Sequence, residues 1–504
     1  MANNIIYSEY QNAVLNYVLN GKGNLIINAV AGSGKTFIIS ECCKQLGMKK
    51  QDCLFLAFNR SIRDELLKKI GDYSEVNTTH QFGLRCLYRC VGRNVKIKID
   101  DNKYRKIIED MVDKTNNEWQ KVLSNAVRLL ELCRANLIQS GDTYAIEDLI
   151  KHHDLSVIAN EIRIVNDLLR DAYELDMVNP VIDFVDMIVL PLSYKNRIPK
   201  YRMVFIDECQ DLNTAQRELM SCAASKGRFV AVGDPNQAIN GFAGADCDSF
   251  DKIAALPYTK SLPLSVNYRC GTSMIDLAKK IVPQIEAHEG AIEGVVDTIT
   301  KVNTDTFQNN DMVLCRTTAP LVATCLKLIR AGRTAVVMGR DIAKGLKSMI
   351  EKSKAKTIKG FESWVDVEKA KLAKEIAKKE HITETEAEQT GRYVAFMDRV
   401  ACILAFGDTE TKLDKVIARL DTIFSDDNVQ NAVTLCTAHK SKGLERDRVL
   451  ILLPHKLPMT WKGQLEWQYQ QELNLRYVAL TRAKKELVFV NLELADLLKL
   501  EFNN

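Results

Sequence analysis

Short apolar runs recur along the chain, and each ends in glycine or polar residues before a longer stretch with helical character begins. Such runs are typical of buried strands. In the first half of the chain they occupy residues 25–27, 53–59, 203–206 and 229–232. In the second half they occupy residues 312–314, 335–338, 449–452 and 487–490. We therefore predict an α/β fold in which helices cover parallel sheets.

Strand-like runs are missing between Val91 and about Val181, where long helical patterns take their place. These patterns cover Tyr104–Lys114, Trp119–Ala135 and Leu155–Leu175. The segment has mixed charge and few glycines, so we interpret it as a helical insertion between strands of one sheet. The phrase Asp183–Met187 that follows is interpreted as the return of the chain to the sheet.

A second helical insertion is predicted between Arg340 and about Gln430. Within it, residues Val367–Thr390 are rich in lysine, glutamate and alanine. A solvated helical face or a coiled hairpin is the ordinary explanation of that composition. A role for its lysines in contacting duplex nucleic acid is the less favoured alternative.

Composition and charge narrow the class of protein only slightly. The chain has 504 residues, 46% of them hydrophobic and 27% charged, and its formal net charge is +4. No apolar run reaches the length of a membrane span, and the first ten residues lack the features of a signal peptide. None of the 14 cysteines forms a CxxC pair. We therefore expect a cytoplasmic protein with reduced thiols, no membrane association and no zinc site.

The stretch from Asn24 to Thr36, NLIINAVAGSGKT, combines a strand, a glycine-rich turn and the start of a helix. That order forms the phosphate cradle of P-loop NTPases. Backbone N–H groups of Ala31, Gly32, Ser33 and Gly34 and the helix N-terminus would face the phosphates. Lys35 would supply charge to the phosphates, and Thr36 a hydroxyl to Mg²⁺. Ala29 stands where the pattern usually has glycine, and a chance glycine turn is the alternative.

Acidic and amide side chains follow two further predicted strands. Asp207 and Glu208 come directly after residues 203–206, and Gln237 follows residues 229–232. Because parallel strands present their carboxyl ends at one edge, these groups are expected near the P-loop. Asp207 would hold Mg²⁺ and Glu208 would polarise the attacking water. Gln237 would lie near the γ-phosphate. An acidic turn without a function is the alternative for the two acids.

Several other side chains are candidates for base or phosphate contacts. Gln11 opens a helix upstream of the P-loop, and its amide could both donate to and accept from an adenine edge. Aromatic side chains can stack on bases, and hydroxyl or imidazole groups can hold phosphates. On these grounds the candidates for nucleic-acid contacts are Phe58, Asn59, Thr79, His80 and Phe242. Taken singly, each also has an ordinary explanation as a core, surface or turn residue.

The order of these segments resembles superfamily 1 helicases of the UvrD/Rep type. The strings AVAGSGKT, LAFNRS, TTHQFG, IDECQD and VGDPNQAINGFAGA are similar to the family's motifs I, Ia, Ib, II and III. Motifs IV, V and VI are similar to LSVNYRC (Leu264–Cys270), CTAHKSKGLE (Cys436–Glu445) and ELNLRYVALTRAK (Glu472–Lys484). The motifs span residues 11 to 484 in the family's order.

The resemblance implies two RecA-like lobes with parallel sheets, each carrying a helical insertion, with ATP bound between the lobes. The implied boundaries are lobe 1 at 1–90 and 183–261 with its insertion at 91–182, and lobe 2 at 262–340 and 431–504 with its insertion at 341–430. Both insertions are short for the family, so the chain resembles a compact member.

The resemblance also implies roles for residues of the second lobe. Arg269 and Arg482 would stabilise charge on the γ-phosphate, because a guanidinium meets phosphate oxygens bidentately. Tyr268 would stack on adenine and Glu445 would contact the nucleotide sugar. Thr437 and His439 would lie on the nucleic-acid side. The implied cofactors are ATP and Mg²⁺.

The activity implied is movement along single-stranded DNA from 3′ to 5′ with unwinding at duplex junctions, by a monomer or weak dimer. Motif III departs from the family pattern at Asn240 and Ala243, where tyrosine and arginine are usual, and Gln471 replaces an acid in motif VI. A second interpretation is therefore kept. In it the protein is an ATP-gated single-strand translocase, or a DNA-binding regulatory or defence module, without processive unwinding. A structural homologue with a dead site is disfavoured by the intact catalytic residues.

Overall fold

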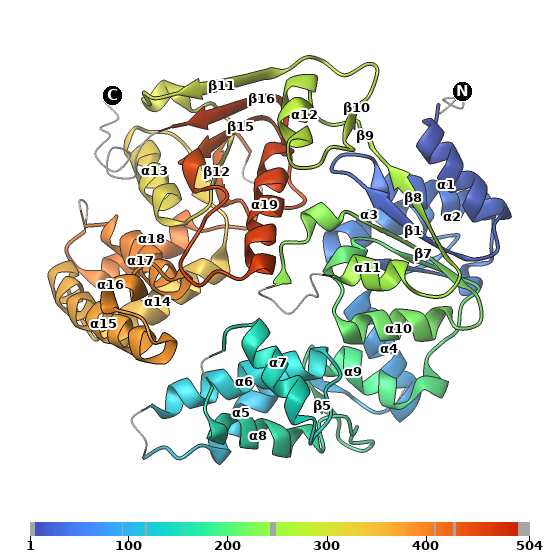
Figure 1. The fold of residues 1–504 in the computed structure, drawn as a ribbon, viewed down its shortest axis with the longest axis horizontal. Coiled ribbons are helices and arrows are strands. Elements are labelled where there is room, and N and C mark those ends of the chain that lie inside the picture. Colours follow the sequence, from blue (N-terminus) through green and yellow to red (C-terminus); the bar gives the residue numbers. More distant parts are fainter. Residues whose placement is uncertain are drawn as a thin grey trace. The chain divides into compact units, whose positions relative to one another are not determined.

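The structure is a computed structural model that describes residues 6–92, 94–115, 118–155, 157–241, 248–407, 410–426 and 430–491. The chain divides into two compact units, Met1–Ser265 and Val266–Asn504. Each unit is built on a parallel sheet of six strands with helices packed against it (Figure 1). The predicted α/β fold with two parallel sheets is therefore confirmed.

The sheet of unit 1 has the strand order β3-β2-β6-β7-β1-β8, and all of its pairings are parallel. Its strands are β1 (Asn24–Ala29), β2 (Cys53–Ala57), β3 (Glu75–Thr78), β6 (Met203–Ile206), β7 (Arg228–Gly233) and β8 (Thr259–Leu264). Every residue of β2 and β6 is buried, because helices cover both faces of the sheet. One strand, β7, separates the glycine-loop strand β1 from the acid-bearing strand β6, so both end at the same edge.

Two hydrophobic cores lie on the two faces of this sheet. One core contains side chains of α1 (Glu9–Asn20), α2 (Lys35–Leu46) and α3 (Arg60–Ile70). The other contains side chains of α4 (Thr79–Val91), α9 (Asp186–Ser193), α10 (Thr214–Ala224) and α11 (Ser249–Ala254).

Helices α4 and α9 approach closely at Gly83, where a Cβ atom would lie 1.9 Å from the carbonyl oxygen of Met187. Only glycine fits this crossing, and it fixes the position of α4 on the sheet.

The first helical insertion has a hydrophobic core of its own. It consists of α5 (Lys103–Met111), α6 (Trp119–Ala135), α7 (Thr143–His152) and α8 (Ala159–Leu169), and it is bracketed by a two-strand pair, β4 (Lys98–Ile99) and β5 (Val181–Ile182). Beyond β5 the chain enters α9, not a strand of the main sheet. Asp183 accepts from the N–H of Asp186 at 2.6 Å and Asp186 from the N–H of Asp183 at 3.0 Å. The helix α9 begins at Asp186, so the predicted return to the sheet at Asp183–Met187 is wrong.

The sheet of unit 2 has the order β11-β16-β15-β12-β14-β13, again entirely parallel. Its strands are β11 (Val295–Ile299), β12 (Met312–Cys315), β13 (Ala335–Val337), β14 (Val433–Thr437), β15 (Arg446–Leu452) and β16 (Ala483–Val490). A short separate pair, β9 (Val266–Asn267) with β10 (Glu286–Ala287), opens the unit.

The second helical segment runs between β13 and β14. The helices of unit 2 are α12 (Thr272–Lys279), α13 (Ala319–Arg330), α14 (Arg340–Ser353), α15 (Ile358–Glu380), α16 (Glu384–Ala387), α17 (Gly391–Leu404), α18 (Leu413–Ile423) and α19 (Glu466–Leu480). Leu346, Phe361, Ile403 and Leu420 share one core with Val313 of β12. Residues of α14, α15, α17 and α18 therefore extend the core of the sheet, whereas Ala373, Ile376, Ala387 and Tyr393 of α15–α17 form a small core of their own (Figure 1). No helix in the described ranges has both the length and the apolar character needed to cross a membrane.

Candidate active site

The loop that joins β1 to α2 contains two glycines in the left-handed region. The angle φ is 67° at Gly32 and 78° at Gly34, values that favour glycine. Gly34 is the N-cap of α2, so the first N–H groups of that helix have no intrahelical acceptor. Ser33 is fully buried, and its hydroxyl donates to the carbonyl of Val30 at 2.8 Å. The loop therefore presents backbone donors and the positive end of the α2 dipole, beginning at Lys35, to an anion.

The first two residues of α2 meet the acids that follow β6. The Lys35 ammonium lies 3.0 Å from Oε1 and 3.2 Å from Oε2 of Glu208. The Thr36 hydroxyl donates to Oδ2 of Asp207 at 2.9 Å. Glu208 has φ of 51°, an unusual value for glutamate, and such outliers cluster at functional sites. Four residues that were predicted from separate motifs thus form one contact network.

The electrostatics of this network are those of a buried cation among carboxylates. Burial disfavours the charged form of Lys35, yet the carboxylates of Glu208, Asp234 and Asp207 outweigh it and raise the pKa of Lys35 above its usual value. Burial and the negative charge of Glu208 raise the pKa of Asp207 to about 6. Three acids around one lysine leave an excess of negative charge that a divalent cation would balance.

Two members of this network were not predicted from the sequence. Gln210 donates to Oε2 of Glu208 at 2.6 Å, and its amide oxygen accepts from the N–H of Asp234 at 3.1 Å. Asp234 is fully buried and accepts from the side chain of Gln237 at 2.7 Å. Gln237, which was predicted, is therefore connected to Glu208 through two hydrogen-bonded neighbours. Gly233 permits this arrangement, because a Cβ there would lie 2.6 Å from Oε1 of Gln210.

Gln11 lies beside the glycine loop although it belongs to α1. It forms a capping box with Ser8, in which the Ser8 N–H donates to Gln11 Oε1 at 3.1 Å and the Gln11 N–H donates to Ser8 Oγ at 3.2 Å. Its amide nitrogen lies 3.8 Å from the place where a Cβ would stand on Gly34. Ala31, another predicted residue, is fully buried in the loop. The contact of Gln11 with adenine stays a prediction.

Candidates for nucleic-acid contacts lie where β2 and β3 end. Ala57 is paired in register with Thr78, so Phe58 and Thr79 follow at the same edge of the sheet. Phe58 is 43% exposed, whereas Thr79 is buried.

The two remaining residues at this edge have structural contacts as well. Asn59 caps α3 by accepting from the N–H of Ile62 at 2.9 Å. The His80 ring meets Phe184 edge-on at 5.9 Å, and burial lowers the pKa of His80. Phe184 is half exposed and was not predicted. Its signal was an aromatic residue between Asp183 and Asp186, directly after the first insertion.

The motif III segment is described only in part, because Phe242 and Ala243 lie outside the described residues. Asn240, which replaces the usual tyrosine, donates to Oδ1 of Asp211 at 3.1 Å. This bond connects the segment to the 3₁₀ turn Cys209–Asp211 that follows Glu208. The substitution at Asn240 therefore creates a polar link to the acidic strand end.

In unit 2, the predicted arginines surround the start of β15 and β16. Arg482 is 1% exposed, and its guanidinium donates to the carbonyls of Val478 at 2.9 Å and Leu444 at 3.1 Å. Arg269 lies 2.5 Å from Glu445 and donates to the carbonyl of Thr481 at 3.2 Å. A second cation, Lys484, lies 2.7 Å from Glu445. The structure therefore brings Arg269, Arg482 and Glu445 into one cluster.

Tyr268 follows the short strand β9 and is 44% exposed. One face of its ring stacks on His288 at a centroid distance of 5.4 Å and an interplanar angle of 29°. His288 follows β10, the strand that pairs with β9, and it accepts from the N–H of Gly290 at 2.8 Å. The histidine was not predicted, and only the β9–β10 pairing brings it to the tyrosine.

Thr437 and His439 lie where β14 ends. The Thr437 hydroxyl accepts from the N–H of Lys440 at 3.3 Å. Burial and the positive charge of Arg316 lower the pKa of His439 to about 3, so this histidine is neutral at physiological pH. Arg316 itself is paired bidentately with Glu472 of α19. A neutral histidine next to a fixed cation suits hydrogen bonding to a nucleic acid, and this role stays a prediction.

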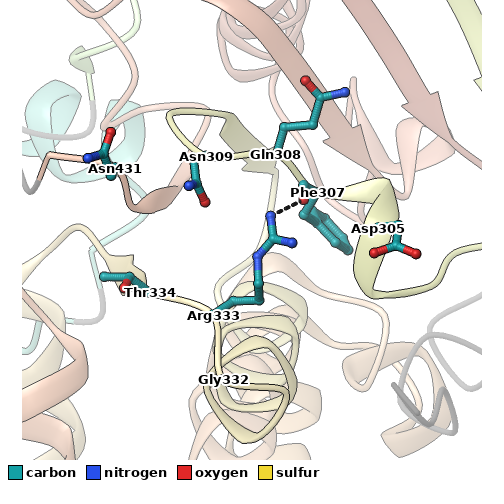
Figure 2. A pocket seen from close by; sticks show the side chains of 8 residues that line it. All are labelled: Asp305, Phe307, Gln308, Asn309, Gly332, Arg333, Thr334 and Asn431. Carbon is teal, nitrogen blue, oxygen red and sulfur yellow. Dashed lines mark hydrogen bonds between the residues drawn. The ribbon is translucent and has the colours of Figure 1, made fainter. Parts of the chain in front are cut away.

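A pocket of about 580 Å³ in unit 2 lies away from these residues (Figure 2). Its walls come from residues that precede β12, β13 and β14, and Arg333 donates across it to the carbonyl of Phe307 at 2.6 Å. It is lined by Asp305, Phe307, Gln308, Asn309, Gly332, Arg333, Thr334 and Asn431. Ligands of open parallel sheets bind at the carboxyl ends of the strands. This pocket lies at the opposite edge, so we do not assign it to nucleotide binding.

Comparison with known proteins agrees with the motif order. Residues 9–256 match the sequence model of the UvrD/REP helicase N-terminal domain. The chain is 27% identical over 308 residues to the ATP-dependent DNA helicase PcrA of Staphylococcus aureus, an alignment that covers 54% of this chain and 40% of PcrA. It is 26% identical over 325 residues to the F-box DNA helicase protein 1 of Schizosaccharomyces pombe, covering 59% of this chain and 34% of that protein.

The chain thus aligns with less than half the length of these curated relatives. Among solved structures, the helicase nonstructural protein 10 of an arterivirus aligns with 97% of this chain and 64% of its own, at 12% identity and a TM-score of 0.33.

Proposed function

Because this chain belongs to the UvrD/Rep-like superfamily 1 helicases, we propose that it is a DNA-dependent ATPase that moves along single-stranded DNA from 3′ to 5′ and unwinds duplex. The observation that carries the proposal is the paired contact of Lys35 with Glu208 and of Thr36 with Asp207. These contacts join the phosphate loop to the acids that hydrolysis needs.

The contacts also suggest how ATP engages the site. The Lys35 ammonium is paired with Glu208. When ATP binds, the phosphates compete for the ammonium, and Glu208 is released to orient the attacking water. Gln210 keeps Glu208 in place during this exchange, because it donates to the carboxylate at 2.6 Å. The left-handed backbone of Glu208 aims the carboxylate at the loop.

The residues present fit a magnesium ion. The Thr36 hydroxyl and the Asp207 carboxylate are oxygen ligands in mutual contact, and Mg²⁺ is usually held by few protein oxygens together with phosphates. When bound, the ion would neutralise charge on the phosphates. The excess of carboxylates around Lys35 supports the presence of this additional positive charge.

Unit 2 would supply the remaining contacts to the nucleotide. Arg269 and Arg482 would meet the γ-phosphate, where a guanidinium can stabilise the charge of the transition state. Glu445 would contact the sugar, and Tyr268 would stack on adenine. Arg482 is held by carbonyl groups of its own unit, so its guanidinium is fixed in direction before ATP arrives, which lowers the cost of reorganisation.

The single strand would cross the carboxyl ends of β2 and β3. The exposed ring of Phe58 would stack on a base, and His80 would lie beside it at the start of α4. The hydroxyl of Thr437 and the neutral His439 of unit 2 would add contacts to the strand. Phe242 is proposed as a further stacking residue on the strength of the sequence alone.

A second candidate function is an ATP-gated translocase or clamp that does not separate strands. The hydrogen bond from Asn240 to Asp211 favours it, because this link replaces the tyrosine that the family usually has between nucleotide and DNA. The two candidates differ on forked duplex DNA, which only a helicase separates. We expect strand separation on a fork with a 3′ single-stranded arm and none on a fork with a 5′ arm.

A variant series tests the ATPase itself. Lys35→Ala should abolish ATP hydrolysis while the protein stays folded, because the charge that meets the phosphates is lost. Lys195→Ala is the matched control, since Lys195 is an exposed lysine paired with Glu218 on the surface of unit 1. Hydrolysis at the parental rate by Lys35→Ala would contradict the assignment of the phosphate loop.

A further inference from the structure

A concave surface in unit 1 carries a basic cluster that the ATPase proposal does not use. It is a pocket of about 490 Å³ at the C-terminal half of α4 and the 3₁₀ turn η2 (Lys195–Arg197). Its lining consists of Arg85, Tyr88, Arg89, Gly92, Asn196 and Arg197. Three of these six residues are arginines, so the lining of the pocket favours binding of an anion.

Two of the three arginines are not neutralised by the protein. Arg85 pairs with Glu75 and donates to the Tyr201 hydroxyl at 3.1 Å. Arg89 and Arg197 are exposed, and within the described ranges no carboxylate lies at ion-pair distance from either of them. The pocket therefore has a net positive charge of two, carried by exposed side chains.

The positive charges of Arg89 and Arg197 both act on the thiol of Cys90. Burial raises the pKa of Cys90, and the positive charges of Arg197 and Arg89 partly oppose that rise. Both guanidinium groups therefore act on the same partly buried atom, although they come from segments far apart in the sequence. Arg85 and Arg89 also lie one helical turn apart on α4, so they share a face.

We propose that this cluster, Arg89 with Arg197, binds backbone phosphates of a nucleic-acid strand outside the strand path proposed above. The inference rests on the proposed function. Exposure of both arginines favours a polymer over a small molecule, because small-molecule sites bury most of their ligand. Arginine forks contact phosphate oxygens bidentately.

The position on α4 supports the same ligand. The helix begins at Thr79 and His80, the predicted contacts at the sheet edge, and has 13 residues. Its length is about 20 Å at ~1.5 Å per residue. A strand or duplex arm that engages the start of α4 can thus reach the arginine cluster without leaving this helix.

The test is the salt dependence of binding to an oligothymidylate of about 20 nucleotides, longer than the ~4–16 nucleotides of a typical single-strand site. The double variant Arg89→Gln with Arg197→Gln should lower the slope of log K against log salt by about 1.4, or ~0.7 per lost phosphate contact. The control is Lys49→Gln with Lys50→Gln, which removes two exposed charges of unit 1 outside the pocket. The control should keep the parental slope.

The outcomes separate this inference from the function on which it rests. If the parent does not bind the oligonucleotide at all, the proposed function fails. If the parent binds and the arginine variant keeps the parental slope, the phosphate site is wrong. A third outcome combines two results. Pyrophosphate raises the melting temperature of the parent but not of the arginine variant, and the salt dependence of DNA binding is the same in both. This outcome would identify a small-anion site and overturn the proposal.

Discussion

Replacing Arg134 by methionine should destabilise unit 1 strongly. Arg134 is fully buried, contacts Asp183 at 2.9 Å and Asp186 more closely, and lies over the Tyr104 ring at 4.2 Å. Removing one partner of a buried ion pair typically costs about 3–5 kcal/mol. Lys103 still neutralises Asp186 at 2.8 Å in the variant, so we expect about 3 kcal/mol. For a unit of this size that corresponds to a drop of roughly 6–12 °C in melting temperature.

The loss of stability caused by Arg134→Met should depend on pH. Burial raises the pKa of Asp186 even in the presence of Arg134, and loss of the arginine should raise it further. A carboxyl whose pKa is higher in the folded than in the unfolded protein destabilises the fold above its folded pKa. That cost disappears as the pH falls towards the unfolded value. The stability gap between variant and parent should therefore narrow between pH 7 and pH 4.

The assay is thermal unfolding followed by circular dichroism at pH 7 and pH 4. A rescue variant combines Arg134→Met with Asp183→Asn and Asp186→Asn, which removes the unpaired charges. It should recover most of the lost stability, because replacing a whole buried ion cluster with neutral groups is often close to neutral. A single variant that melts within about 1 °C of the parent, a difference of less than ~0.5 kcal/mol, would refute the reasoning. So would a rescue variant no more stable than the single one.

Three further substitutions test separate parts of the site. Phe58→Ala should weaken single-strand binding by about 1–3 kcal/mol through loss of one stacked base. The control Tyr73→Ala, which removes another exposed aromatic side chain, should not. Equal affinities of the two variants for single-stranded DNA in a fluorescence anisotropy titration would remove Phe58 from the strand path. Gly34→Ala places a side chain at φ of 78° and costs about 1–2 kcal/mol, so the ATP concentration for half-maximal hydrolysis should rise at least several-fold. His288→Ala removes the stack beneath Tyr268 and should weaken ATP binding by about 0.5–1.5 kcal/mol, measured by calorimetry; unchanged affinity would mean that the stack is only structural.

The sequence was most informative where burial is complete. The predicted runs at 25–27, 53–59, 203–206 and 229–232 correspond to β1, β2, β6 and β7, whose interiors are apolar. Two edge strands, β8 and β11, escaped prediction for a physical reason. In β11 the residues are at least partly exposed. Strand β8 contains Pro263, and its buried and exposed positions do not alternate regularly. Neither strand therefore forms an apolar run. Pairing with a neighbouring strand, which the local pattern does not reveal, defines both.

The site shows the same division between local and long-range information. Lys35 with Thr36 and Asp207 with Glu208 were predicted because each pair belongs to one short motif. Asp234 was not singled out, although it directly follows a buried strand as Asp207 does. Its electrostatic effect on Lys35 arises because β7 lies between β1 and β6 in the sheet.

Contacts between distant segments were beyond reach for the same reason. The Arg134–Asp186 pair joins residues 52 positions apart, and Tyr268 meets His288 only through the β9–β10 pairing. Composition and periodicity carry no signal for either contact.

The measurement that tests the central claim most directly is the rate of ATP hydrolysis with and without single-stranded DNA, for the parent and for Glu208→Gln. The account predicts that DNA accelerates hydrolysis by the parent and that the variant is slower by about 100-fold to 10,000-fold, the usual contribution of a positioned acid–base group. Unaltered binding of ATP by the variant would show that its fold is intact. Hydrolysis at the parental rate by Glu208→Gln, or a parental rate indifferent to DNA, would contradict the account.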